Sequence, residues 1–349
     1  MAEETEMNSI SVPDAETSPA PKRKHRTLRV LAIVLGVIVG VIVLAIVSVN
    51  VFVRSVYAEF YDNASPEFAI PGVSQGFIPQ DLDYFDKTDE WLFSGYMGDG
   101  SPSPLYKSSE HSATVRFTAE APDGTAYTGH GSGITSNSTN VFLTREGGYL
   151  VFAADDIANV GDGGTVRAIG EVDIEVTPAF LNIENSILYA GNFYFPEKYE
   201  TPAEHRIFTT DGNQNPAVMY AYPASPDARF GYAEQAVCVY SIPEMVQGMC
   251  TTPAGQMVFS TSYGLRSSRL LFFDAGLLEQ DGTFFADGRD VPLYICDTRS
   301  LVGEVEAPPM TEGIESHDER IYIAEESASN KYIFGKLYGA GVVYALKPL

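Results

Sequence analysis

The polar and apolar positions of this chain alternate over short stretches that predict β-strands, and no long helical period follows the first sixty residues. Five times a polar or glycine-containing step opens a strand, and a more apolar partner strand follows. The openings are 78–82, 131–134, 178–181, 246–249 and 311–314, and the partners are 91–96, 141–144, 187–191, 257–261 and 321–325. Recurrence at a spacing of roughly fifty to seventy residues is typical of a radial β array. The pattern predicts an all-β, five-bladed β-propeller, with six blades as the alternative if the long third or fourth unit contains another.

Most units can be written with four strands. The predicted strands are 77–85, 91–97, 104–108 and 113–119 in unit one; 132–137, 141–144, 149–153 and 165–176 in unit two; 179–183, 187–195, 218–222 and 236–241 in unit three; 247–252, 257–263, 269–273 and 292–296 in unit four; and 312–316, 320–325 and 341–346 in unit five. The last unit lacks a fourth strand. Because propellers protect their open edge by pairing the two ends of the chain in one blade, we expect the segment around 67–73 to supply it.

A charge-free apolar run covers residues 30–53. As a helix it would be about 36 Å long, enough to cross a bilayer. Basic residues precede the run and only Arg54 follows it closely, which predicts a cytoplasmic N-terminus and an extracytoplasmic remainder. The alternative is a signal peptide cleaved near 56–58, but the run is long for one. The predicted organisation is a disordered cytoplasmic tail with a basic flank (1–29), a transmembrane signal-anchor helix (30–53), a connector with a candidate ring-closing strand (54–73) and an extracytoplasmic propeller (74–349).

The formal charge of −24 lies entirely beyond residue 29, because residues 1–29 contain five acidic and five basic side chains. So acidic a domain repels phosphate backbones and disfavours nucleic-acid binding, although plain solvation also explains the charge. Three cysteines, Cys238, Cys250 and Cys296, are an odd number. Cys238 and Cys250 could pair if their strands are adjacent, or all three could be small buried residues.

The opening positions of the units predict which residues line the central channel. These positions hold Gln80, Ser132, Ala179, Gln247 and Glu312, and His130 lies just upstream in the second unit. Amides, a hydroxyl, a carboxylate and an imidazole that converge at one mouth could bind a polar ligand or a cation. Alternatively, Gln80, Ser132 and Gln247 satisfy backbone groups or hold channel waters.

The ends of the second strands add further candidates. Tyr96, Phe193 and Tyr263 are expected near one face, where aromatic rings suit sugars or partner side chains, unless they simply pack between blades. Glu325 and Glu326 alternate sides, so one of them can face the channel. With Glu312 it would form a carboxylate pair, and we predict Glu312 and Glu326 as ligands of a divalent cation such as Ca²⁺ or as acid–base groups.

Seven motifs resemble those of an uncharacterised bacterial family of membrane-anchored β-propellers of the cell envelope. They are Gly76–Tyr84, Ser94–Met97, Gly129–Ile134, Val246–Met249, Ser260–Gly264, Pro308–Ile314 and Glu326–Ala328. The resemblance implies a propeller similar in style to the gluconolactonase-like proteins and implies no established activity. Gluconolactonase-like propellers hold a divalent metal with Glu, Asn and Asp from several blades, and here only Glu312 occupies a comparable Glu-Gly position.

The sequence lacks a nucleophile elbow, a P-loop, a His-Glu-x-x-His motif and a Cys-x-x-Cys pair. We therefore expect a membrane-anchored propeller that binds a glycan, a cell-wall fragment or a protein partner in the envelope, and we assign no catalytic residue. The alternative is a metal-assisted hydrolase or lactonase at the channel mouth, using Glu312, His130 and Glu326. A docking scaffold is the third reading.

Overall fold

The computed structural model describes residues 23–349, so most of the predicted cytoplasmic tail lies outside the described residues. The chain divides into two compact units, residues up to Ile46 and Val47–Leu349. Helix α1 (Arg23–Val56) begins in the first unit, and its apolar side chains there are exposed. Within residues 23–349 it provides the one stretch, Arg26–Val56, that is long and apolar enough to cross a membrane.

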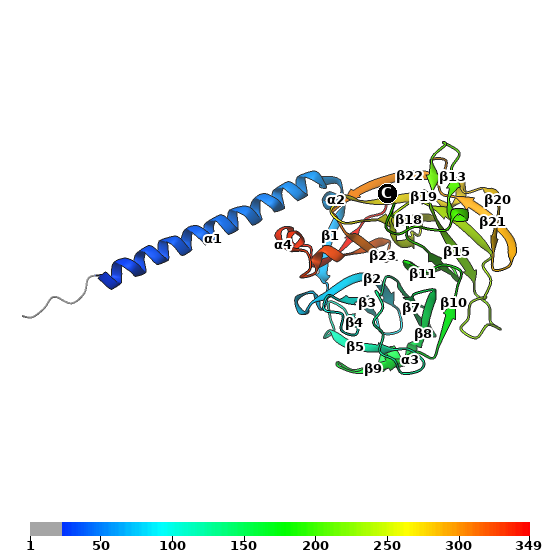
Figure 1. The fold of residues 1–349 in the computed structure, drawn as a ribbon, viewed down its shortest axis with the longest axis horizontal. Helices are drawn as coiled ribbons and strands as arrows, with labels where there is room; N and C mark the ends of the chain where they lie inside the picture. Colours follow the sequence, from blue (N-terminus) through cyan, green and yellow to red (C-terminus); the bar gives the residue numbers. More distant parts are fainter. Residues whose placement is uncertain (1–22) are drawn as a thin grey trace, which may run out of the picture. The chain divides into compact units, whose positions relative to one another are not determined.

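Within the described part of the second unit, the strands form the five blades of a propeller (Figure 1). From the inside outward, blade 1 contains β2 (Phe77–Phe85), β3 (Glu90–Met97), β4 (Pro104–Ser108), β5 (Val115–Glu120) and β9 (Thr165–Arg167). Blade 2 contains β6 (Ile134–Ser136), β7 (Asn140–Arg145), β8 (Gly148–Ala153) and β10 (Gly170–Asp173). Blade 3 contains β11 (Phe180–Glu184), β12 (Ile187–Gly191), β15 (Ala217–Pro223), β16 (Cys238–Ile242), β21 (Arg289–Ile295) and β20 (Gln280–Ala286).

Blade 4 contains β17 (Val246–Thr251), β18 (Gln256–Thr261), β19 (Ser268–Asp274) and β22 (Leu301–Ala307). Blade 5 contains β23 (Thr311–His317), β24 (Arg320–Glu325), β25 (Val342–Leu346) and, on its outer edge, β1 (Ala64–Ala69). The remaining elements are α2 (Ala58–Asn63), α3 (Ala154–Asn159), α4 (Ile333–Tyr338), the hairpin of β13 (Ile207–Phe208) and β14 (Gln214–Asn215), and the 3₁₀ turns η1 (Val73–Gln75), η2 (Ala203–His205), η3 (Ala275–Leu277) and η4 (Glu326–Ala328).

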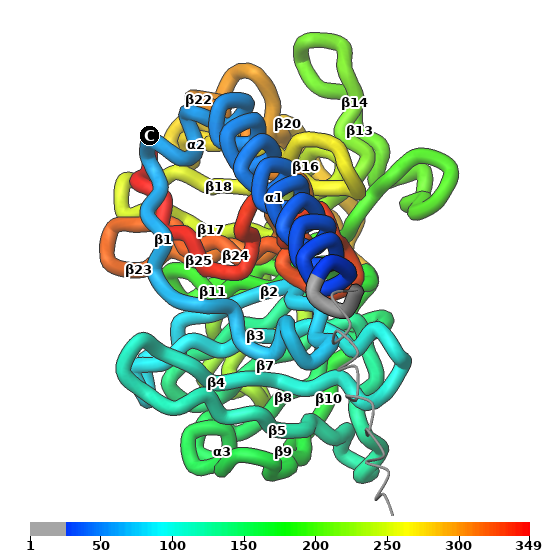
Figure 2. Tube along the Cα trace, turned by 90° about the vertical axis from the view of Figure 1, so that its left-hand side faces the viewer, coloured from blue at the N-terminus to red at the C-terminus, as the bar shows by residue number. Residues whose placement is uncertain are grey.

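The inner strands of the blades close into a ring. Strand β2 contacts β6, and contacts continue through β11, β17 and β23 back to β2. The N-terminal strand β1 pairs antiparallel with β25, so both ends of the propeller meet in blade 5 (Figure 2). This pairing covers the edge that β25 would otherwise expose.

The hydrophobic core lies between neighbouring blades. At the seam between blades 5 and 1, for example, Phe77 and Phe93 of blade 1 pack in one cluster with Ala324 and Val343 of blade 5. Four similar clusters join the other pairs of neighbouring blades, and each blade therefore buries both of its faces. At the base of α1, Val53 and Phe60 are buried in the cluster between blades 4 and 5.

Two predicted strands belong, in part or in whole, to a different blade from the one expected. The stretch 165–176 is divided between blades, because β9 pairs parallel with β5 of blade 1 whereas β10 pairs with β8 of blade 2. The stretch 292–296 belongs to β21, which pairs parallel with β16 of blade 3, and β22 is the outer strand of blade 4. An alternating pattern shows which face of a strand is buried but does not show which sheet edge the strand joins.

Candidate functional site

Three inner strands contain a β-bulge at the same level of the channel. The register between β2 and β3 shifts between Pro79 and Asp81, and the pairing skips Gln80. The same happens at Gln247 in β17, and in β23 the pairing skips Glu312 and Gly313. Because a bulge releases a residue from the ladder and redirects its side chain, the three polar residues turn toward one another.

Two glycines allow the inner strands to approach at this level. A Cβ atom on Gly248 would lie 2.6 Å from the carbonyl oxygen of Glu312, and one on Gly313 would lie 2.5 Å from the Cα of Asp81. Any side chain at either position would push β23 away from β17 or β2. The glycines therefore keep blades 4, 5 and 1 close enough for side chains to bridge them.

Glu312 accepts hydrogen bonds from the blades on either side. The Nε2 atom of Gln80 donates to its Oε2 across 3.0 Å, and the Nε2 atom of Gln247 donates to its Oε1 across 3.3 Å. Glu312 and Gln80 are each only 4% exposed. These bonds bring together three of the residues that the repeat pattern nominated.

Glu326 reaches the same place from η4, which follows β24. Its Oε1 accepts hydrogen bonds from the hydroxyls of Tyr96 and Tyr332, each at 3.2 Å. The ammonium of Lys331 lies 3.9 Å from that oxygen and donates to the Tyr96 hydroxyl across 2.6 Å. We call Glu312, Glu326 and these bonded neighbours (Gln80, Gln247, Tyr96, Lys331 and Tyr332) the mouth site.

The two carboxyls of the mouth site interact as a pair. Burial raises the pKa of Glu312 well above its usual value, and the charge and hydrogen bond of Glu326 raise it further. Burial also raises the pKa of Glu326, while Lys331 and the hydrogen bonds that Glu326 accepts oppose that rise. The pair as a whole therefore holds a proton to higher pH than two separate carboxyls would.

His130 forms one wall of the mouth site. Its ring stacks on Tyr96, with centroids 4.3 Å apart and planes inclined by 27°. Desolvation, followed by the positive charge of Lys331, lowers the pKa of His130, even though part of the residue remains exposed. The imidazole is thus neutral at pH 7 and can accept a hydrogen bond from a ligand.

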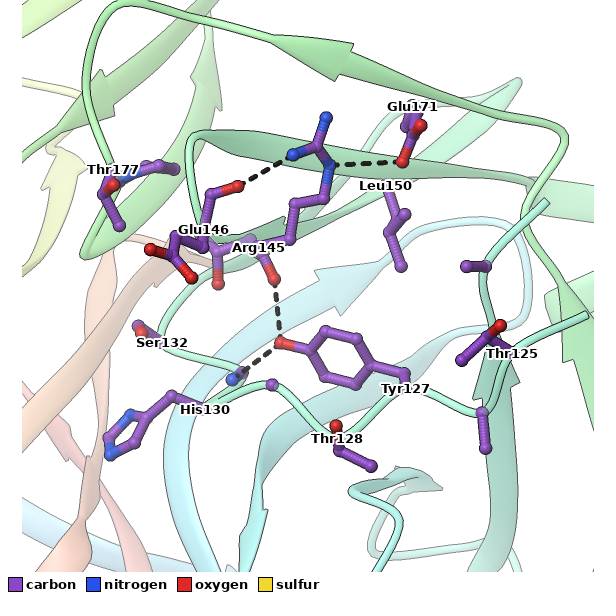
Figure 3. Close-up of a pocket in the computed structure, with 16 residues that line it drawn as sticks. Thr125, Tyr127, Thr128, His130, Ser132, Arg145, Glu146, Leu150, Glu171 and Thr177 are labelled. Carbon is purple, nitrogen blue, oxygen red and sulfur yellow. Dashed lines mark hydrogen bonds and ion pairs between the residues drawn. The ribbon is translucent and has the colours of Figure 1, made fainter. Parts of the chain in front are cut away.

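The loop that carries His130, with His130 itself, also lines a cavity of about 430 Å³ (Figure 3). The hydroxyl of Tyr127 accepts from the Gly131 amide and donates to the Thr144 carbonyl, each across 2.8 Å, which fixes the loop. In Figure 3 the His130 ring points away from Tyr127. Ser132 lines this cavity and has no hydrogen bond to the carboxyl pair among the described contacts.

Tyr263 belongs to a separate aromatic cluster. Its ring lies 3.8 Å from Phe195 and 6.2 Å from Phe193, measured between centroids, and its hydroxyl accepts from Lys198 across 2.7 Å. Phe193 and Tyr263 therefore lie together, whereas Tyr96, which was expected beside them, stacks on His130.

The metal prediction can be compared with the ligands present. Within residues 23–349, no three His, Cys, Asp or Glu side chains form a group that could hold a metal ion. Glu312 and Glu326 supply two carboxyls, and their oxygens already accept bonds from amides and phenols. Calcium usually takes six to eight oxygen ligands, so this pair by itself would provide a minority of them.

Sequence reasoning missed Lys331 and Tyr332. They lie in a segment without strand alternation, and their proximity to Glu326 was the only signal available. It also missed a second polar level deeper in the channel. There the Nδ2 atom of Asn182 in β11 donates to Glu315 of β23 across 2.9 Å, and burial raises the pKa of Asp83 to about 7.

All three cysteines of the described chain are free, so Cys238 and Cys250 do not pair.

The fold defines the class of the protein, a five-bladed β-propeller with an N-terminal apolar helix.

No family model and no curated protein matches the chain. Among solved structures, it is similar to a glucose dehydrogenase-type oxidoreductase from Thermus thermophilus (11% identity, 81% of this chain and 99% of that one, TM-score 0.40). It is also similar to the PQQ-bound aldose sugar dehydrogenase of Streptomyces coelicolor (12%, 75% and 78%, TM-score 0.37) and to BamB of Moraxella catarrhalis (8%, 77% and 85%, TM-score 0.32). At these identities and scores, the similarities carry no argument about activity.

Proposed function

We propose that this protein is a membrane-anchored propeller of the cell envelope that binds a hydroxyl-rich ligand, such as a glycan or a cell-wall fragment, at its mouth site. The observation that carries the proposal is the Glu312–Glu326 pair, which side chains from blades 1 and 4 hold near the beginnings of the inner strands β2, β17 and β23.

The chemistry of the mouth site suits such a ligand. A sugar presents hydroxyls that donate and accept, and apolar C–H faces that pack on aromatic rings. The carboxyl pair and the neutral imidazole of His130 supply acceptors, and Lys331 supplies a donor. The rings of Tyr96 and Tyr332 provide flat surfaces beside them, each with the Lys331 ammonium within 5.3 Å of the ring centroid.

The anchor is the stretch Arg26–Val56. The basic residues before it support a cytoplasmic N-terminus, which would place the propeller outside the cytoplasm. Protease added to intact cells should then digest the propeller and spare an N-terminal tag. Protection of the propeller and loss of the tag would reverse the orientation and would leave the mouth site untouched.

Binding can be tested on the full chain in non-ionic detergent. We expect a saturable rise in melting temperature with one class among monosaccharides, peptidoglycan fragments and envelope oligosaccharides. Glu326→Gln and Lys331→Met should each weaken that binding by about ten-fold, which corresponds to the loss of one charge-assisted hydrogen bond. Glu279→Gln is the matched control for Glu326→Gln, since Glu279 is exposed and the substitution removes the same charge away from the mouth site. Binding that survives both mouth variants would show that the ligand lies in another place.

The second candidate is hydrolysis at the same site, as a hydrolase or lactonase. It is favoured by one observation: two buried carboxyls, Glu312 and Glu326, lie close enough to interact, and burial raises the pKa of each, a setting that acid–base catalysis can use. Product release from lactones or glycosides by the wild type, abolished in Glu312→Gln, would support it. Repeating the assay with a chelator and with added Ca²⁺, Mn²⁺ or Zn²⁺ would test whether a metal takes part.

A further inference from the structure

A second cavity, of about 560 Å³, lies where blades 5 and 1 meet. It is built at the far ends of the strands that form the mouth site. Tyr84 lies near the end of β2, and His317 is the last residue of β23, whereas Gln80 and Glu312 lie nearer the beginnings of these strands. The N-terminal strand β1 contributes Glu67 and Phe68, so the cavity exists only because the ring closes.

The floor of this cavity is a cluster of aromatic rings around Trp91. The ring centroid of Tyr322 lies 4.4 Å from Trp91, that of Tyr84 lies 5.3 Å away and that of Phe68 lies 5.9 Å away. His317 stacks on Tyr84 at 3.4 Å and meets Trp91 edge-on at 5.8 Å. Trp91 is 5% exposed, while Phe68, Tyr84 and Tyr322 are half-buried and border the open space.

The walls are acidic. Of the fourteen described residues that line the cavity, five are Asp or Glu and none is Lys or Arg. Three of these carboxylates have partners: Arg320 lies 3.3 Å from Glu67, Tyr84 donates to Asp89, and Glu90 accepts from Ser112 across 2.9 Å and lies 4.0 Å from the Lys107 ammonium.

The other two carboxylates each have a neighbouring histidine as their one partner among the described contacts. Asp318 lies 3.3 Å from His317, and Glu110 lies 3.9 Å from His111. The cavity therefore retains negative charge above an aromatic floor.

From this geometry we infer a second binding site, specific for an organic ammonium cation. Aromatic faces attract such cations through their quadrupoles, and the carboxylates add direct attraction while the alkyl groups pack on the rings. An anion would be repelled by the walls. A neutral apolar ligand would gain no attraction from the carboxylates, and no three metal-ligating side chains of the described chain come together to favour an inorganic ion. The site is independent of the mouth site and of any glycan bound there.

Trp91 is the only tryptophan of the chain, so its fluorescence reports directly on this cavity. Choline, titrated into the full chain in non-ionic detergent, should change that fluorescence along a saturable curve. Its neutral isostere 3,3-dimethylbutan-1-ol, which has the same shape without the charge, should bind at least about ten-fold more weakly. Equal binding of the two compounds, or no saturation by choline, would overturn the inference.

Two variants test the residues. Tyr322→Leu and the double substitution Glu110→Gln with Asp318→Asn should each weaken choline binding by about five-fold or more. Glu279→Gln, which removes a charge outside the cavity, should leave it unchanged. A short peptide with one lysine and its Nε-acetylated form separate the sources of the ammonium group. Tighter binding of the lysine peptide than of choline would indicate that the natural ligand is a side chain of a protein. Weaker binding of the peptide would indicate a free amine. Equal binding of the lysine peptide and its acetylated form would contradict the inference.

Discussion

The amide of Gln80 and the carboxyl group of Glu312 are 232 positions apart in the chain, and they share a hydrogen bond of 3.0 Å. The bond joins the inner strand of blade 1 to that of blade 5, where the ring closes. Both residues stand in β-bulges, so the same local irregularity in two distant strands builds one contact.

Removal of the Gln80 amide should therefore destabilise the ring. Gln80→Ala leaves a buried carboxyl oxygen of Glu312 without its donor, at a cost of about 1–3 kcal/mol in the free energy of unfolding. Urea denaturation followed by Trp91 fluorescence measures this cost. Gln214→Ala, at an exposed position, should change the value by less than about 0.5 kcal/mol. Equal effects of the two substitutions would contradict a structural role for the bond.

The close approach of β23 to β2 gives a second prediction. Gly313→Ala places a methyl group against the backbone of Asp81, which cannot move aside without opening the seam. Overpacking of this kind costs about 1–3 kcal/mol or more. Gly161→Ala is the control, because nothing lies within 4 Å of its added Cβ. A thermal melt in which Gly313→Ala matched the wild type would show that the two strands are further apart than described.

The buried carboxyl group of Glu325 should make the free energy of unfolding depend on pH. Burial raises its pKa to about 8, with partial opposition from the Ser327 hydroxyl, and its Oε1 has no partner among the described residues. Between the ordinary pKa of 4.5 and about 8, the folded state binds more protons than the unfolded state. The stability contributed by protonated Glu325 is therefore present at acidic pH and is lost as pH rises through that window.

Glu325→Gln should remove this loss. Relative to the wild type, the variant should gain about 3 kcal/mol in the free energy of unfolding between pH 5 and pH 8. Glu279→Gln, at an exposed position, should follow the wild-type pH profile. Parallel profiles for wild type and Glu325→Gln would mean that Glu325 is solvated or paired in the folded protein.

Lys331 sets the charge balance of the mouth site, which yields a fourth prediction. Its ammonium lowers the pKa of His130 and of both carboxyls. Lys331→Gln should therefore raise the pKa of His130, by about half a unit to one unit, in an NMR titration assigned with a His130→Gln variant. Lys336→Gln is the control, because it removes the same charge from a lysine that donates to the Ala328 carbonyl and does not belong to the mouth site. A His130 pKa that fell or stayed constant would show that Lys331 lies elsewhere in solution.

The choice between Glu325 and Glu326 shows how far the strand pattern reaches. Alternation predicts that one of them faces the channel, and it is Glu326 that bonds within the mouth site. Glu325 points instead toward the core, where its charge raises the pKa values of Tyr338 and Tyr344. The period of two gave the alternatives, and the packing of η4 selected between them.

The sequence by itself determined the five repeated strand pairs, the apolar helix and the positions of Gln80, Gln247 and Glu312, because these follow from local alternation and from recurrence along the chain. Only the tertiary structure decided that Lys331 and Tyr332 join these residues, that Ser132 and Tyr263 lie aside, and that β9 and β21 extend neighbouring blades. The reason is physical. Side-chain alternation is fixed by the strand's own geometry, whereas loop placement and parallel edge pairing depend on which surfaces the closed ring brings into contact.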